Sequence, residues 1–138
     1  MNITTDTRKM LQLMSQVILA DGHIYDSEIE ALVGGASQLG LTDLSGQALE
    51  TDQIRAWFNA YLQELNENWS AENKDIVLTR LILSLAEWPD KQAVLNTLIK
   101  ISLADDSFHL EEKTLISIVK AYWQYDGLDA PGSKIIKA

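Results

Sequence analysis

Two short stretches of the sequence place acidic residues at the same spacing after an apolar segment. In the first stretch Asp21 is followed seven positions later by Glu28, and in the second Asp105 is followed seven positions later by Glu112. Carboxylate oxygens are the ligands that Ca²⁺, Mg²⁺ and Mn²⁺ prefer in proteins. These four residues are therefore the candidate ligands of a divalent-cation site.

Further acidic residues and both histidines of the chain lie in or beside the same stretches. These less favoured candidate ligands are Asp26, Asp106, Glu111, His23 and His109. The two histidines occupy different positions in the two stretches, which is more typical of exposed imidazoles than of a transition-metal site. We therefore keep them as secondary candidates.

The first stretch reads like the last two-thirds of an EF-hand calcium loop. The upstream ligands of such a loop are missing, because Val17 and Leu19 stand where oxygen ligands would be needed. A single stretch of this kind cannot complete the coordination of an ion. We expect the two stretches to face each other and to complete one site between them.

A shift of the sequence by 84 positions aligns the two stretches with each other. Residues 19–21, Leu-Ala-Asp, then coincide with residues 103–105, and Ile24 coincides with Phe108. The alignment predicts a duplicated helix–loop–helix with approximate twofold symmetry. Ile24 and Phe108 are expected to point inward and to anchor each corner to the core.

A purely structural role explains the same acidic residues. An aspartate before a glycine is typical of a helix end, and a glutamate in the first turn of a helix is favoured by the capping box and by the helix dipole. In this alternative Asp21 and Glu28 accept hydrogen bonds from backbone N–H groups at the start of the second helix. The sequence leaves both interpretations open.

Composition limits the class of protein. The chain has 138 residues, 46% of them hydrophobic, no cysteine and a net charge of −9. The absence of cysteine excludes disulfides, thiolate zinc sites and a cysteine nucleophile, and the negative charge disfavours binding to nucleic acid.

The first ten residues lack the apolar run of a secretion signal, and no apolar segment is long enough to span a membrane, so we expect a cytoplasmic protein.

The apolar residues recur every three or four positions along the chain, which predicts an all-α, single-domain helical bundle over residues 1–138. The expected repeat halves cover about residues 6–41 and 90–128, with central helices at about 51–88. The predicted helices are 6–20, 26–39, 51–66, one that begins after Ser70 and ends before Pro89, 90–104 and 110–125.

Two of the predicted helices have distinctive patterns. The helix before Pro89 carries apolar residues around most of its circumference, which predicts a position in the centre of the core. The helix over 26–39 contains Gly34 and Gly35, although glycine disfavours a helix interior by about 1 kcal/mol relative to alanine. We expect a bend or a close backbone approach at these glycines.

The acidic stretches and the order of the helices resemble the TerB-like family, the domain of a bacterial tellurite-resistance protein. The first stretch has the family's pattern A-D-G-x-[IV]-x-x-x-E, and the second is similar but has Asp106 in place of the glycine and Phe108 in place of the aliphatic residue. The matching residues of the first stretch are Ala20, Asp21, Gly22, Ile24 and Glu28. The resemblance implies a pseudo-symmetric helical bundle of stress-response systems, in which the paired acidic loops bind a divalent cation.

The sequence contains no catalytic nucleophile paired with a base, no phosphate-binding loop and no zinc-protease motif. The expected function is therefore a non-enzymatic, stress-associated adaptor, which docks a basic or membrane-associated protein partner through its acidic surface or an aromatic groove. A divalent metal-binding or metal-sensing protein is the first alternative. A small hydrolase that uses an acidic dyad is the second.

Overall fold

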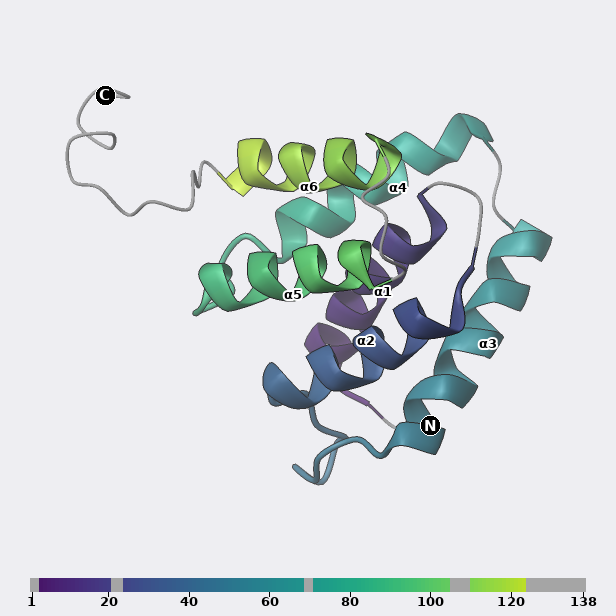
Figure 1. The fold of residues 1–138 in the computed structure, drawn as a ribbon, viewed down its shortest axis with the longest axis vertical. Coiled ribbons are helices and arrows are strands. Elements are labelled where there is room, and N and C mark those ends of the chain that lie inside the picture. The colour runs from purple at the N-terminus through teal and green to yellow at the C-terminus, as the bar shows by residue number, and fades with distance from the viewer. Residues whose placement is uncertain (1–2, 21–23, 69–70, 105–109, 124–138) are drawn as a thin grey trace.

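The computed structural model describes residues 3–20, 24–68, 71–104 and 110–123, and within these ranges it is an all-α bundle (Figure 1). Its helices are α1 (Thr5–Leu19), α2 (Asp26–Gln38), α3 (Thr51–Asn68), α4 (Ala71–Ser84), α5 (Lys91–Leu103) and α6 (Leu110–Trp123). The extended contacts in the described residues are two isolated bridges, Ile3 with Asp43 and Thr42 with Ala48. The predicted fold class and the order of the helices are confirmed.

Helix α1 lies at the centre of the bundle, where it contacts α2, α4, α5 and α6. Six apolar residues that form one stripe of α1 are fully buried: Met10, Leu11, Leu13, Met14, Val17 and Ile18. Figure 1 shows α1 behind α2 and α5, with α3 along one edge of the bundle. The helix that the rest of the fold surrounds is therefore the first one.

The predicted central position of α4 is wrong. Ile76 is 53% exposed and Leu83 is 50% exposed, while Leu81, Ile82 and Leu85 are buried. One side of α4 thus packs on α1 and α6 and the opposite side faces solvent. An apolar circumference predicts burial only if enough neighbouring elements exist to cover it, and α1 already occupies the centre of this bundle.

Helix α4 also ends at Ser84, four residues before the predicted end at Trp88. After Ser84 the backbone forms hydrogen bonds between residues three positions apart. The Leu85 N–H donates to the Ile82 carbonyl, and the Trp88 N–H donates to the Leu85 carbonyl. Pro89 follows this turn. Such tighter bonds are common where an α-helix ends.

Two helix ends have well-defined caps. Gly40 has a φ of 68°, and the N–H of Leu41 bonds to the Ala36 carbonyl at 3.1 Å, which is the Schellman arrangement. The Asp90 carboxylate accepts a hydrogen bond from Ala93 N–H at 3.1 Å and so caps α5. These local contacts end α2 and begin α5 at the expected positions.

A buried polar contact joins the central helix to α3. The Gln16 amide donates a hydrogen bond to the Tyr61 hydroxyl at 3.0 Å, and both side chains are buried. Burial raises the pKa of Tyr61, an effect that the hydrogen bond from Gln16 opposes and the charge of Glu64 adds to. The Tyr61 ring also stacks on Trp57, with their ring centroids 5.0 Å apart.

We predict that Tyr61→Phe lowers the free energy of unfolding by about 1–2 kcal/mol, because the buried Gln16 amide then loses its acceptor. Urea denaturation followed by circular dichroism measures this loss. The double variant Gln16→Leu with Tyr61→Phe removes both polar groups and should recover part of the stability. A double variant as unstable as the sum of the two single variants would contradict this account.

Candidate functional site

The first acidic corner has a buried glutamate as its central feature. Glu28 is the third residue of α2 and its side chain is fully buried. Its Oε1 accepts a hydrogen bond from the Tyr25 N–H at 3.2 Å, and its own N–H bonds back to the Tyr25 carbonyl at 3.0 Å. Glu28 therefore closes the start of α2, as the capping interpretation expects.

The second acidic corner repeats this placement. Glu112 is the third residue of α6, and it too is fully buried. In the view of Figure 1, the ends of α1 and α5 and the starts of α2 and α6 all lie on the side of the bundle nearer α3. Complete burial is rare for glutamate, because removing an ionised carboxylate from water is costly unless charges or donors compensate it.

Five of the predicted ligands lie outside the described residues: Asp21, His23, Asp105, Asp106 and His109. Of the rest, Asp26 is exposed at the first position of α2, and Glu111 occupies the second position of α6. The described ranges contain no group of three His, Cys, Asp or Glu side chains placed to hold a metal ion. The four-carboxylate site and the twofold symmetry of the two halves stay predictions.

The expected inward anchor of the first corner is wrong. Ile24 is 46% exposed, so it does not plug the corner into the core, and its counterpart Phe108 lies outside the described residues. The first corner is held instead by Glu28 and by the buried Leu32 one turn further along α2. Apolar character alone does not predict burial, because single apolar side chains are common on protein surfaces.

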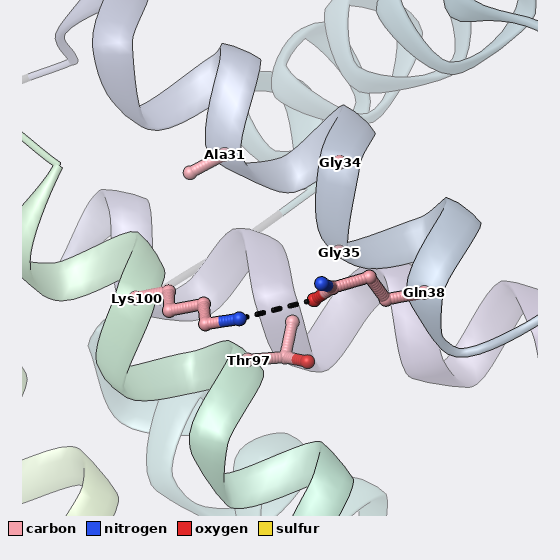
Figure 2. Close-up of a pocket in the computed structure, with 6 residues that line it drawn as sticks. All are labelled: Ala31, Gly34, Gly35, Gln38, Thr97 and Lys100. Carbon is pink, nitrogen blue, oxygen red and sulfur yellow. Dashed lines mark hydrogen bonds between the residues drawn. The ribbon is translucent and has the colours of Figure 1, made fainter.

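A hollow lies where α2 crosses α5 (Figure 2). Its volume is about 230 Å³ and its lining is mainly apolar. The lining residues are Ala31, Gly34, Gly35, Gln38, Thr97 and Lys100. We call this hollow the α2–α5 groove.

The two glycines of the α2–α5 groove have different roles. A Cβ atom at Gly35 would collide with Thr97 Cγ2 and would lie 2.9 Å from Met14 Cε, so Gly35 permits the close approach of α2 to α5. A Cβ atom at Gly34 would meet no atom within 4 Å. The predicted close backbone approach is confirmed at Gly35, whereas nothing within the described fold requires a glycine at position 34.

Lys100 extends across the groove toward α2, as Figure 2 shows. Its ammonium group donates a hydrogen bond to Gln38 Oε1 at 3.3 Å. An ammonium group has three donor hydrogens, and Gln38 is a neutral acceptor. The positive charge of Lys100 is therefore available to an acidic group that enters the groove.

A second hollow lies on α3, with a volume of about 300 Å³ and with Gln53, Ala56, Trp57 and Ala60 around it. Trp57 is partly exposed, so this hollow offers one aromatic side chain between two alanines. Two further aromatic residues stand at the end of α6. Tyr122 is exposed, but Trp123 is buried and donates its indole N–H to the Ile82 carbonyl at 2.7 Å.

Sequence reasoning missed Lys100 as a groove residue. Lysine on an amphipathic helix is usually a solvated residue, and only the crossing of α2 over α5 brings its ammonium group to Gln38. The pair of glycines at positions 34 and 35 was the available signal. It predicted the close approach but not which helix would approach.

The described fold is a small all-α domain in which α2 and α6 each carry a fully buried glutamate at the third position. The family model of the tellurite resistance protein TerB matches residues 7–127, and the chain therefore belongs to the TerB family. TerB is not a known enzymatic family. No match was found among curated proteins or among solved structures.

No helix in the described part of the chain is both long and apolar enough to cross a bilayer.

We predict opposite effects for alanine at the two glycines of α2. Gly34→Ala should raise the free energy of unfolding by about 0.5–1 kcal/mol, because alanine favours a helix interior and the space is open. Gly35→Ala should lower it by about 1–3 kcal/mol, because the new methyl group forces Thr97 and Met14 to move. Urea denaturation of both variants tests the pair, and a destabilising Gly34→Ala would show that the fold itself needs that glycine.

Proposed function

We propose that this TerB-family chain is a non-enzymatic, stress-associated adaptor domain that docks a protein partner in the α2–α5 groove. The observation that carries the proposal is the open space at Gly34. This glycine costs helix stability, has an ordinary helical backbone and packs against nothing in the described fold. A bare backbone at such a position supports the close approach of an element from outside the domain.

A helix is the element that fits the groove best. Helices pack at interaxial distances of about 8–10 Å, and small residues at the contact allow the shorter distances. Ala31 and Gly34 lie three positions apart on α2 and both line the groove. A partner helix laid against them would cover the exposed backbone of α2 at its centre.

Charge adds selectivity to this contact. The net charge of −9 favours a partner whose surrounding surface is basic, including a partner held at a membrane. Lys100 acts at a shorter range and favours an acidic side chain at the point where the partner helix crosses the groove. Both contributions should weaken as the salt concentration rises.

The association with stress rests on the family, whose model is named for tellurite resistance. Neither of the two hollows is lined by a carboxylate, so neither supports the hydrolase alternative with an acidic dyad. The divalent-cation function depends on other residues.

We predict that the partner captured from a native-type lysate is lost when the groove is filled. Gly34→Leu places a side chain in open space on a helix, so the fold should stay at least as stable while the partner no longer fits. Lys100→Glu should weaken capture and reduce its dependence on salt. Quantitative mass spectrometry of the captured proteins measures both effects.

The control for this experiment is Ala56→Leu, an equivalent small-to-large change at an exposed position of α3. It should leave capture unchanged. A partner retained by Gly34→Leu but lost with Ala56→Leu would move the docking surface to the hollow beside Trp57. A partner retained by all three variants would refute both surfaces.

The second candidate function is binding or sensing of a divalent cation by Asp21, Glu28, Asp105 and Glu112. The complete burial of Glu28 and Glu112 at equivalent positions of α2 and α6 supports it. A bound cation would offset the cost of burying carboxylates, and oxygen ligands select Ca²⁺, Mg²⁺ or Mn²⁺. Occupancy of the site would then fix the two corners relative to each other.

We predict that Ca²⁺, Mg²⁺ or Mn²⁺ raises the Tm of the metal-free protein, with a stabilisation of roughly 2.7 kcal/mol at one hundred times Kd. Asp21→Asn with Glu28→Gln should abolish the rise, whereas Glu87→Gln, which changes an exposed glutamate after α4, should keep it. Differential scanning calorimetry with and without each ion tests this. If no ion shifts Tm and the double variant merely melts lower, the carboxylates are helix caps only.

A further inference from the structure

A row of exposed side chains runs along the side of α4 that faces away from α1 and α6. Ile76, Arg80 and Leu83 belong to this row, and all three are exposed. Their spacing of four and then three positions places them in one line along the helix. The row leaves apolar surface in water, because Ile76 and Leu83 are each about half exposed.

The turn after α4 adds an acidic residue to the same row. Ser84, the last residue of α4, is exposed. The hydrogen bonds that follow it join residues three positions apart, and in such a turn each side chain lies over the one three positions before it. Glu87 therefore lies over Ser84 on the outer side, and it is exposed as well. We define the α4 outer row as Ile76, Arg80, Leu83 and Glu87.

The charges of the α4 outer row complement a second copy of the same row. Arg80 and Glu87 carry opposite charges and lie on either side of Leu83 in the sequence. A twofold axis perpendicular to α4 sets the helix antiparallel to its copy, so positions before the axis on one copy meet positions after it on the other. With the axis next to Leu83, each Arg80 faces Glu87 of the other copy, and the two Leu83 side chains meet at the centre. The turn after α4 of one copy then covers Ile76 of the other.

The composition of the α4 outer row favours a second copy over other occupants. Arg80 and Glu87 cancel, so the row is neutral on a chain whose net charge is −9, and the repulsion between two copies is reduced where they meet. A partner surface of a single charge sign would attract one of these two residues and repel the other. A second copy satisfies both residues at once.

The size of the α4 outer row sets the expected strength of the contact. Stable interfaces bury about 800 Å² on each partner, and one line of four side chains buries less. Exposed ion pairs contribute little to affinity and mainly fix the register, so the apolar contacts at Leu83 and Ile76 supply most of the free energy of association. We therefore expect monomer and dimer to be in equilibrium at micromolar to millimolar concentration.

We propose that two copies of the chain form a reversible antiparallel dimer through the α4 outer row, with Leu83 at the twofold axis and Arg80 of each copy paired with Glu87 of the other. The α2–α5 groove is lined by residues of α2 and α5 alone, so each copy keeps its own groove and the dimer carries two. The proposal does not depend on what binds in the groove.

Sedimentation equilibrium over this concentration range tests the proposal, because the mass of the wild-type protein should rise from that of one chain toward that of two. Arg80→Glu alone and Glu87→Arg alone should each raise the Kd of the dimer by about tenfold or more, since each dimer then contains two contacts between like charges. An equimolar mixture of these two variants should associate about as strongly as the wild type. In the mixed dimer the two acidic positions of one variant face the two basic positions of the other.

The apolar centre of the contact has its own variant and control. Leu83→Asp should abolish association, whereas Leu44→Asp makes the same change at a residue that is 65% exposed outside the row and should leave Kd unchanged. Circular dichroism verifies that these variants at exposed positions stay folded. A wild-type chain that stays monomeric up to millimolar concentration would overturn the proposal. So would a mixture of the two charge variants that associates no better than either variant alone, or association that survives Leu83→Asp.

Discussion

The apolar side chains of α1 cover a broad arc of the helix, and their burial requires neighbours on more than one side. At 100° per residue, the arc from Leu13 to Leu11 spans about 160°, and the polar Ser15 and Gln16 beyond its edges are buried too. Ser15 donates to the Leu11 carbonyl within α1, and Gln16 donates to Tyr61 of α3. The other helices are arranged so that this broad arc of α1 is covered and each of these two polar groups is bonded.

The crossing of α2 and α5 follows from the same constraint. Both helices cover α1, and Gly35 lets them approach each other closely above it, with Met14 of α1 also in contact range. The absence of a side chain at Gly35 thus serves the fold. The absence of a side chain at Gly34 is not needed for packing in the described fold. Gly35 is therefore explained by helix packing, whereas Gly34 is free to serve a function.

Much of this fold could be predicted from sequence, because helix periodicity and capping are local properties. The stripe of α1, the Schellman end at Gly40 and the Asp90 cap each depend on residues within a few positions of one another. The wrong predictions concern which helix surfaces pack against each other. The exposure of α4 and of Ile24 depends on where other helices lie, and no local pattern reports that.

The candidate site likewise has some features that the sequence could predict and others that it could not. The position of Glu28 at a helix start and its bond to the Tyr25 backbone follow from local spacing, whereas its complete burial does not. Lys100 became a candidate only through its contact with Gln38, 62 positions earlier in the chain. The predicted cation ligands could not be brought together by sequence reasoning, because their convergence depends on the packing of two separate corners.

The residues that precede α1 and its first turn are bonded to the turn at Thr42 and Asp43, which leads toward α3. Ile3 forms a bridge with Asp43, and the Thr7 hydroxyl donates to the Thr42 carbonyl at 3.1 Å. Asp43 in turn organises its own turn by accepting from the N–H groups of Ser45 and Gln47. A pulling force applied at the amino end would therefore be transmitted to the segment that leads into α3 before α1 itself began to unwind.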